Sequence, residues 1–160
     1  MNDERQELEE KRFVEDVGFF IEQYGLPRMA GRILGWLLIC DPPHQSLAEM
    51  SEALMASKGS ISTMTRLLVQ LGIIERIGLP GLRHDCFRVK PGTWDEHIKQ
   101  YISRVTAARQ LSERGLELLK GRDPQVRKRL EVMRDIHTFL EEQMRTLLER
   151  WEQGRKETEQ

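Results

Sequence analysis

The chain has 160 residues, of which 39% are apolar and 32% are charged, and its formal net charge is −1. This length suits one modest domain with an appendage and excludes two domains that each have a large core. No apolar run approaches the roughly 18 residues of a membrane span, and no secretory signal follows the N-terminus. We therefore expect a cytoplasmic protein that makes no membrane contact.

The charge is concentrated in one part of the chain. Between Ser57 and Lys90 there are six basic and two acidic residues, a net charge of +4, so the remainder carries −5. Such a segment indicates a polyanionic partner. The two cysteines, Cys40 and Cys86, are far apart in sequence, which excludes a disulfide framework.

Two helices are expected at the start of the chain. Between residues 4 and 24, apolar side chains recur at steps of three and four, which is typical of an amphipathic helix. Gly25 ends this helix and Pro27 opens a second one, which runs to about Cys40. The second helix is apolar on most sides, so we expect it to be buried.

Two shorter helices follow. Ser46-Leu47-Ala48-Glu49 is a capping box at the start of a helix that ends near Leu54. Ser57 is a second N-cap, and its helix ends at Gly72. One face of that helix is apolar, whereas the other face carries small, hydroxylic or cationic side chains.

A hairpin and two long helices complete the chain. The short β-branched segments 73–77 and 84–89 flank the turn residues Gly78-Leu79-Pro80-Gly81, which predicts two strands with a basic tip. A capping box at Thr93 begins a helix to about Leu119, and Asp123-Pro124 begins a final helix of about thirty residues. Eight residues of that helix, spaced alternately four and three apart, form the predicted seam of a coiled coil or bundle. They are Val126, Leu130, Met133, His137, Leu140, Met144, Leu147 and Trp151.

The order helix, turn, helix, hairpin is that of a winged helix-turn-helix. We therefore predict a mainly α single domain over residues 1–160, with a small β-hairpin wing. Its DNA-binding core would span 27–90, and its helical dimerisation region 1–24 and 93–156. An exposed helix in the major groove needs small side chains near phosphate and donors near base edges. The predicted DNA-binding residues are Ser57, Lys58, Gly59, Ser60, Ser62, Thr63, Arg66, Gln70 and Arg83.

Several segments resemble the MarR-type regulators, in particular the branch named after the glycine betaine synthesis repressor, GbsR. Gly25-Leu26-Pro27-Arg28-Met29-Ala30-Gly31-Arg32-Ile33-Leu34-Gly35, with Asp41-Pro42, is similar to the start of that branch's DNA-binding domain. The segments Ser57-Lys58-Gly59-Ser60-Ile61-Ser62, Leu71-Gly72-Ile73-Ile74-Glu75-Arg76 and Gly81-Leu82-Arg83 are similar to its recognition helix and wing. The resemblance implies a homodimer clamped by terminal helices and transcriptional control, often repression that a small-molecule effector relieves.

Two positions depart from the family pattern. Met55 stands where the helix-turn-helix bend commonly has glycine, so a remodelled turn is expected, since a left-handed backbone there would cost about 1 kcal/mol. Leu82 replaces the acidic residue that often precedes the wing arginine, and Asp85 lies beyond it. The ion pair that braces the wing arginine in relatives is therefore in question for Arg83.

For the predicted seam, an intramolecular bundle is the alternative to dimerisation. Dimerisation is favoured because a helix this long outreaches the small core available to cover it. The predicted dimer-interface residues are Val14, Val17, Phe20, Ile21, Leu130, Met133, His137, Leu140, Met144, Leu147 and Trp151.

No phosphate-binding glycine loop, HExxH motif or nucleophile elbow is present, so we predict no enzyme activity, no cofactor and no metal site. The sequence predicts a repressor that binds double-stranded DNA as a homodimer on a pseudo-palindromic operator. The rival prediction is a winged-helix adaptor that binds another protein. Arg28 and Arg32 could equally brace helix packing or contact phosphate.

Overall fold

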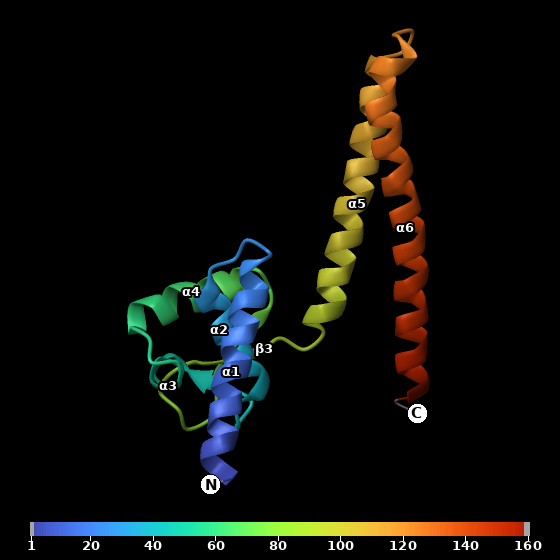
Figure 1. Ribbon diagram of the computed structural model, residues 1–160. Helices are drawn as coiled ribbons and strands as arrows, with labels where there is room; N and C mark the ends of the chain where they lie inside the picture. Colours follow the sequence, from blue (N-terminus) through green and yellow to red (C-terminus); the bar gives the residue numbers. More distant parts are fainter. Residues whose placement is uncertain (1, 159–160) are drawn as a thin grey trace. The chain divides into compact units, whose positions relative to one another are not determined.

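The computed structural model describes residues 2–158, which form two compact units divided between Thr93 and Trp94. Residue 1 and residues 159–160 of the predicted single domain lie outside the described residues. The elements run α1-α2-β1-α3-α4-β2-β3-α5-α6 (Figure 1). The mainly helical class with a small β wing is therefore confirmed.

In the first unit, α1 (Asn2–Glu22) packs closely against α2 (Arg28–Ile39). Glycines allow the two backbones to approach, because a Cβ on Gly31 would lie only 2.8 Å from the Cα of Gly18 and 2.8 Å from the carbonyl oxygen of Val17. Val14 is buried in this contact. The apolar face predicted for the first helix is thus partly covered within its own chain.

The sheet has three antiparallel strands in the order β1-β3-β2, where β1 is Gln45–Ser46, β2 is Ile74–Ile77 and β3 is Cys86–Val89. The sequence predicted only the β2–β3 hairpin. It missed β1 because that strand has two polar residues and no alternation, so only its pairing with β3 makes it a strand.

The helix-turn-helix consists of α3 (Leu47–Ala53) and α4 (Lys58–Gln70). Its core contains apolar side chains from α1, α2, α3, α4, β2 and β3, and the largest fully buried ones are Ile33, Leu34, Met50, Ile61, Leu68 and Ile74. Between the helices, Met55 has a φ of +48° and is the residue that the sequence placed at a glycine position. The bend is therefore left-handed, as a glycine would make it, and the expected remodelling does not occur.

The second unit is an antiparallel hairpin of α6 (Pro124–Thr158) against α5, which begins at Thr93 and ends at Leu118 (Figure 1). The helices come close near Gly115, where an added Cβ would lie 2.7 Å from a methyl carbon of Leu130. At the open end of the hairpin, Asp95 accepts hydrogen bonds from Trp151 at 3.0 Å and from Arg155 at 2.5 Å.

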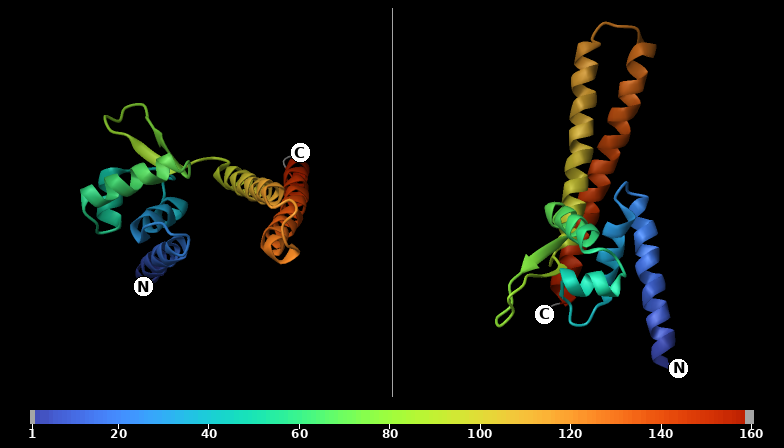
Figure 2. Two further views of the ribbon diagram at one scale, coloured as in Figure 1. Left: turned by 90° about the horizontal axis from the view of Figure 1, so that it is seen from above. Right: turned by 90° about the vertical axis from the view of Figure 1, so that its left-hand side faces the viewer.

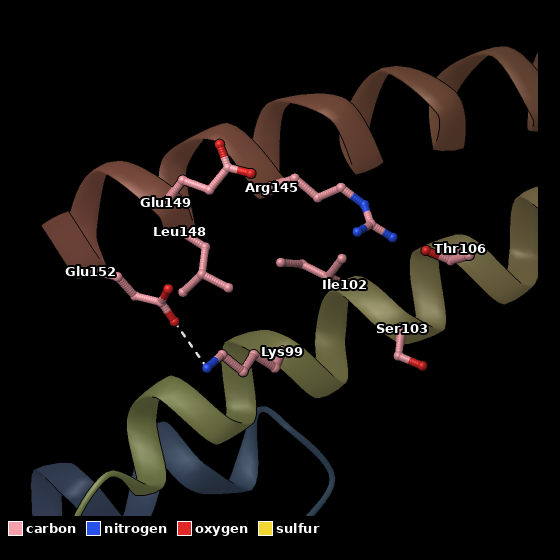
Figure 3. Close-up of a pocket in the computed structure, with 8 residues that line it drawn as sticks. All are labelled: Lys99, Ile102, Ser103, Thr106, Arg145, Leu148, Glu149 and Glu152. Carbon is pink, nitrogen blue, oxygen red and sulfur yellow. Dashed lines mark ion pairs between the residues drawn. The ribbon is translucent and has the colours of Figure 1, made fainter.

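A groove of about 450 Å³ runs between α5 and α6 (Figure 3). The side chains of Ile102 and Leu148 point into it, and Lys99 pairs with Glu152 across it at 2.9 Å. Arg145 also lies along the groove. Polar and apolar groups thus alternate along the contact of the two helices.

The predicted seam of α6 divides into two kinds of residue. Five of them are half-buried, namely Leu130, Met133, His137, Leu140 and Met144, whereas Val126, Leu147 and Trp151 are exposed. Another apolar stripe, formed by Val132, Ile136 and Phe139, is about half exposed, and the sequence did not single it out. None of the helices within residues 2–158 combines the length and apolarity needed to cross a bilayer.

Candidate DNA-binding interface

The start of α4 presents free backbone amides. Ser57 is its N-cap, and the Ser57 hydroxyl accepts a hydrogen bond from the amide of Ser60 at 3.2 Å. Lys58 and Gly59 are exposed beside it, and nothing lies within 4 Å of a Cβ built on Gly59. The positive end of the helix dipole, unbonded amides and an ammonium group therefore meet, as phosphate binding requires.

The two faces of α4 separate by chemistry. Ile61, Thr65 and Leu68 are buried, and so anchor the helix in the core. The predicted DNA-facing side chains on this helix are exposed or partly exposed: Ser57, Lys58, Gly59, Ser60, Ser62, Thr63, Arg66 and Gln70. The predicted outer face is thus accessible along its whole length.

The wing is fixed to the end of α4 at its base. The Lys90 amide donates to the carbonyl of Ile73 at 3.0 Å, and the buried Thr93 hydroxyl donates to the carbonyl of Gly72 at 3.0 Å. Arg83 is exposed in the loop between β2 and β3, which extends beyond the body of the first unit (Figure 2). The reading helix and the wing are therefore held by a common base.

Ion pairs decide which cations of this segment are available. Arg88 pairs with Glu75, directly opposite on the neighbouring strand, at 2.7 Å, and Arg76 pairs with Asp85 at 3.2 Å. Asp85 therefore braces the stem of the wing through Arg76. It does not pair with Arg83, the arginine whose ion pair was in question because Leu82 replaces the acidic residue. Among the described residues, no carboxylate pairs with the remaining four cations, namely Lys58, Arg66, Arg83 and Lys90.

A hollow of about 560 Å³ joins the reading helix to the wing. Its lining includes Lys58 and Ser62 from α4, His84 and Asp85 from the wing, and residues at the start of α3. That start is a complete capping box, since the Ser46 amide donates to Glu49 at 2.6 Å and the Glu49 amide donates to the Ser46 hydroxyl at 3.2 Å. The hydrogen bonds from Ser46 hold the pKa of Glu49 below its usual value.

Arg28 and Arg32, the two arginines with an undecided role, both reach Glu15 on α1. The distances are 2.5 Å from Arg28 and 2.7 Å from Arg32, and Arg28 also lies 3.8 Å from the ring centroid of Phe19. The structure therefore supports the bracing role for both side chains.

The cysteines have an environment that opposes reactivity. Burial is the main cause that raises the pKa of both the Cys40 and the Cys86 thiol. Because the thiolate is the reactive form, these side chains are suited to packing.

Sequence reasoning did not place His84 beside α4 and did not pair Arg76 with Asp85. Only the strand register and the fold of the hairpin bring these residues to the hollow or to each other. A surplus of basic residues in the sequence could not distinguish the paired arginines from the unpaired ones.

A recognition helix with an accessible hydroxylic and cationic face, beside a basic hairpin, defines a winged helix-turn-helix DNA-binding protein. The family model of MmpR5-like MarR family transcriptional regulators matches residues 92–155. The HTH-type transcriptional regulator MmpR5 of Mycobacterium tuberculosis (strain H37Rv) is 40% identical over 88% of this chain and 86% of its own length.

Two further likenesses agree. The HTH-type transcriptional repressor OpcR of Bacillus subtilis (strain 168) is 27% identical over 61% of this chain and 52% of its own length. The crystal structure of a transcriptional regulator superposes with a TM-score of 0.72 and 39% identity, over 91% of this chain and 99% of that one. The chain belongs to the MarR family of winged helix-turn-helix transcriptional regulators, and it is a DNA-binding regulator. These relatives are transcriptional regulators rather than enzymes.

Proposed function

We propose that the chain acts in the cytoplasm as a homodimeric repressor that binds a pseudo-palindromic DNA operator. The observation that carries this proposal is the set of unpaired cations, Lys58 and Arg66 on α4 and Arg83 and Lys90 on the wing. Lys58, Arg66 and Arg83 lie on the two elements that a winged helix-turn-helix lays against a duplex, and Lys90 follows β3 at the base of the wing. Thr63, Arg66 and Gln70 would meet base edges, whereas Lys58 and the α4 amides would hold phosphate.

Exposed apolar side chains support the dimer. On α6, Val132, Ile136 and Phe139 are spaced four and three apart and are 55%, 49% and 56% exposed. On α1, Phe20 is 54% exposed. Such a helix stripe is stable in water when a second copy covers it. We assign the dimer contacts to residues 1–24 and 93–156, and the DNA-binding contacts to 27–90.

A small-molecule effector is part of the proposal, as is membership of the GbsR-like branch. The quoted segments of α2, α4 and the wing support that branch. The groove between α5 and α6 offers room for an effector, which would act by unequal affinity for two spacings of the reading helices. The rival, a protein-binding adaptor, is disfavoured because an adaptor has no need for unpaired cations on both α4 and the wing.

The decisive experiment selects bound duplexes from a random DNA pool and then measures their affinity against salt. We expect a two-fold motif with half-sites about 10 bp apart, or a multiple of that, and a steep loss of affinity as salt rises. Arg66→Ala should relax base preference, with a loss of about 1–3 kcal/mol at its base pair. Arg83→Ala should weaken binding more uniformly.

Arg122→Ala is the matched control, because Arg122 is an exposed arginine in the turn between α5 and α6, outside the proposed DNA-binding residues and the exposed stripe of α6. It should leave both affinity and motif unchanged. Recovery of no motif from the pool, or an affinity that is constant from low to moderate salt, would contradict the proposal.

A further inference from the structure

Arg32, on α2, links α1 to the bend of the helix-turn-helix. Its Nε lies 2.7 Å from Glu15 Oε1 on α1, and its Nη2 donates to the carbonyl oxygen of Leu54 at 3.0 Å. The Arg32 side chain is only 19% exposed. A guanidinium presents several donors in a fixed plane, so it can hold both partners at once.

The carbonyl that Arg32 binds belongs to the bend itself. Leu54 is the C-cap of α3 and is buried, and the next residue is the left-handed Met55. The Ala56 amide then donates back to the carbonyl of Ser51 at 3.1 Å, and α4 begins at Lys58. The direction in which α4 leaves α3 is therefore set within a few residues of the contact with Arg32.

The other end of the link is also fixed. Glu15 pairs with Arg28 as well, at 2.5 Å, and the close approach of Gly18 to Gly31 packs the two helices tightly at this point. Because packed helices resist small displacements, a shift of α1 would carry Glu15 and Arg32 with it. A cavity of about 200 Å³, lined by Glu15, Arg32, Trp36, Leu54 and Met55 among others, lies at the link.

We propose that Arg32 is a positioning residue for DNA reading: it ties the helix-turn-helix bend to Glu15, so that α1 controls the orientation of α4. This inference rests on the proposed DNA-binding function. It gives α1 a route to the reading helix through contacts inside the first unit. A partner copy or effector that displaced α1 would thereby alter operator affinity without touching DNA.

The test compares Arg32→Lys with Arg28→Gln in the full chain. Lysine keeps the charge, but its one nitrogen cannot replace both guanidinium nitrogens, Nε facing Glu15 and Nη2 facing the Leu54 carbonyl. Arg28→Gln is the matched control, since it also removes an arginine from Glu15 but touches no residue of the bend. Glu15→Gln weakens the anchor and leaves the Leu54 contact in place.

Two quantities are measured: affinity for the selected operator against a random duplex of equal length, and hydrogen exchange of the Met55 and Ala56 amides without DNA. We expect Arg32→Lys to lose about five- to tenfold in operator affinity, with random-duplex affinity unchanged and faster exchange at the bend. Glu15→Gln should change both quantities in the same direction by less, and Arg28→Gln, which leaves both contacts of Arg32 in place, should have the smallest effect.

Equal losses of operator affinity in Arg32→Lys and Arg28→Gln would mean that Arg32 only supports helix packing, and would overturn the inference. Unchanged hydrogen exchange at the bend in Arg32→Lys would overturn it as well. These outcomes differ from failure of the proposed function, in which the unmodified chain itself prefers no duplex. If Arg32→Lys fails to fold, the inference is still tested by hydrogen exchange of the Met55 and Ala56 amides in Glu15→Gln and Arg28→Gln.

Discussion

At the scale of single residues, Met55 combines a left-handed backbone with a long side chain. Its φ is +48° and the side chain is 81% exposed, so few contacts offset the steric strain between Cβ and the backbone. The bend keeps the left-handed geometry because Leu54 and Ala56 are held on either side of it by hydrogen bonds to α3.

Met55→Gly should therefore stabilise the first unit. We expect the free energy of unfolding to rise by about 0.5–1 kcal/mol, since strain is relieved while the unfolded chain gains some entropy. Urea unfolding followed by circular dichroism measures this. Met55→Ala is the control, because it removes the exposed side chain and keeps the strain, and a gain as large as that of glycine would contradict the explanation.

At the scale of elements, the α1–α2 contact depends on Gly31. A Cβ at this position would lie 2.8 Å from Gly18 Cα and 2.9 Å from the Cβ of Ile21. The backbone of α1 cannot move aside without disturbing Val14 and the Glu15 ion pairs, so little relaxation is available.

Gly31→Ala should lower the free energy of unfolding by about 1–3 kcal/mol, as overpacked cores do. Gly59→Ala provides the control in the same measurement, since open space surrounds its Cβ and alanine favours helix. Similar stabilities for the two variants would show that α1 and α2 can separate at little cost.

In the α5–α6 hairpin, Glu141 is the most strongly perturbed carboxylate. Hydrogen bonds from Arg109, at 2.7 Å, and from other side chains lower its pKa from 4.5 to about 2. The folded-state pKa lies below the unfolded one, so the stabilisation is complete above about pH 4.5 and is lost as the pH falls towards 2.

Glu141→Gln should accordingly be less stable than the unmodified chain at neutral pH, and this difference should shrink between pH 4.5 and 2. Thermal unfolding of the hairpin at a series of pH values gives the comparison. Glu142→Gln, on the exposed neighbouring position, is the control and should follow the unmodified chain. A stability difference that stayed constant with pH would mean that Glu141 acts through packing alone.

At the scale of the whole molecule, DNA reading on a two-fold operator requires two copies held together. The exposed stripe of Val132, Ile136 and Phe139 is the face of α6 that α5 leaves accessible. Three half-exposed apolar side chains at this spacing are what a helix-bundle interface needs.

Phe139→Glu should shift the chain from dimer to monomer in sedimentation or light scattering, with its helix content retained. Affinity for a two-fold operator should fall with it, because the two half-sites would no longer be bound together. Leu82→Glu is the control for the measured oligomeric state, since it adds the same charge at an exposed apolar residue of the wing. A Phe139→Glu chain that stayed dimeric would exclude this stripe as the interface.

The order of the helices and of the β2–β3 hairpin, and the polar face of α4, follow from the sequence alone. Helix periodicity, the capping box at Ser46, the N-cap at Ser57, and turn residues around Gly78 and Gly81 are local signals, because each depends on side chains a few positions apart. The exposed residues of α4 could be named for the same reason: the spacing of Ile61 and Leu68 determines which face turns inward.

Only the tertiary structure decided which charges and apolar faces remain available. Arg76 and Arg88 pair with carboxylates of the hairpin, and Arg32 contacts both α1 and the bend. Five residues of the predicted α6 seam are half-buried within their own chain. These are contacts between residues distant in sequence, fixed by strand register and by helix packing. A linear pattern carries no record of either, because it specifies which face of an element is apolar but not which neighbour covers it.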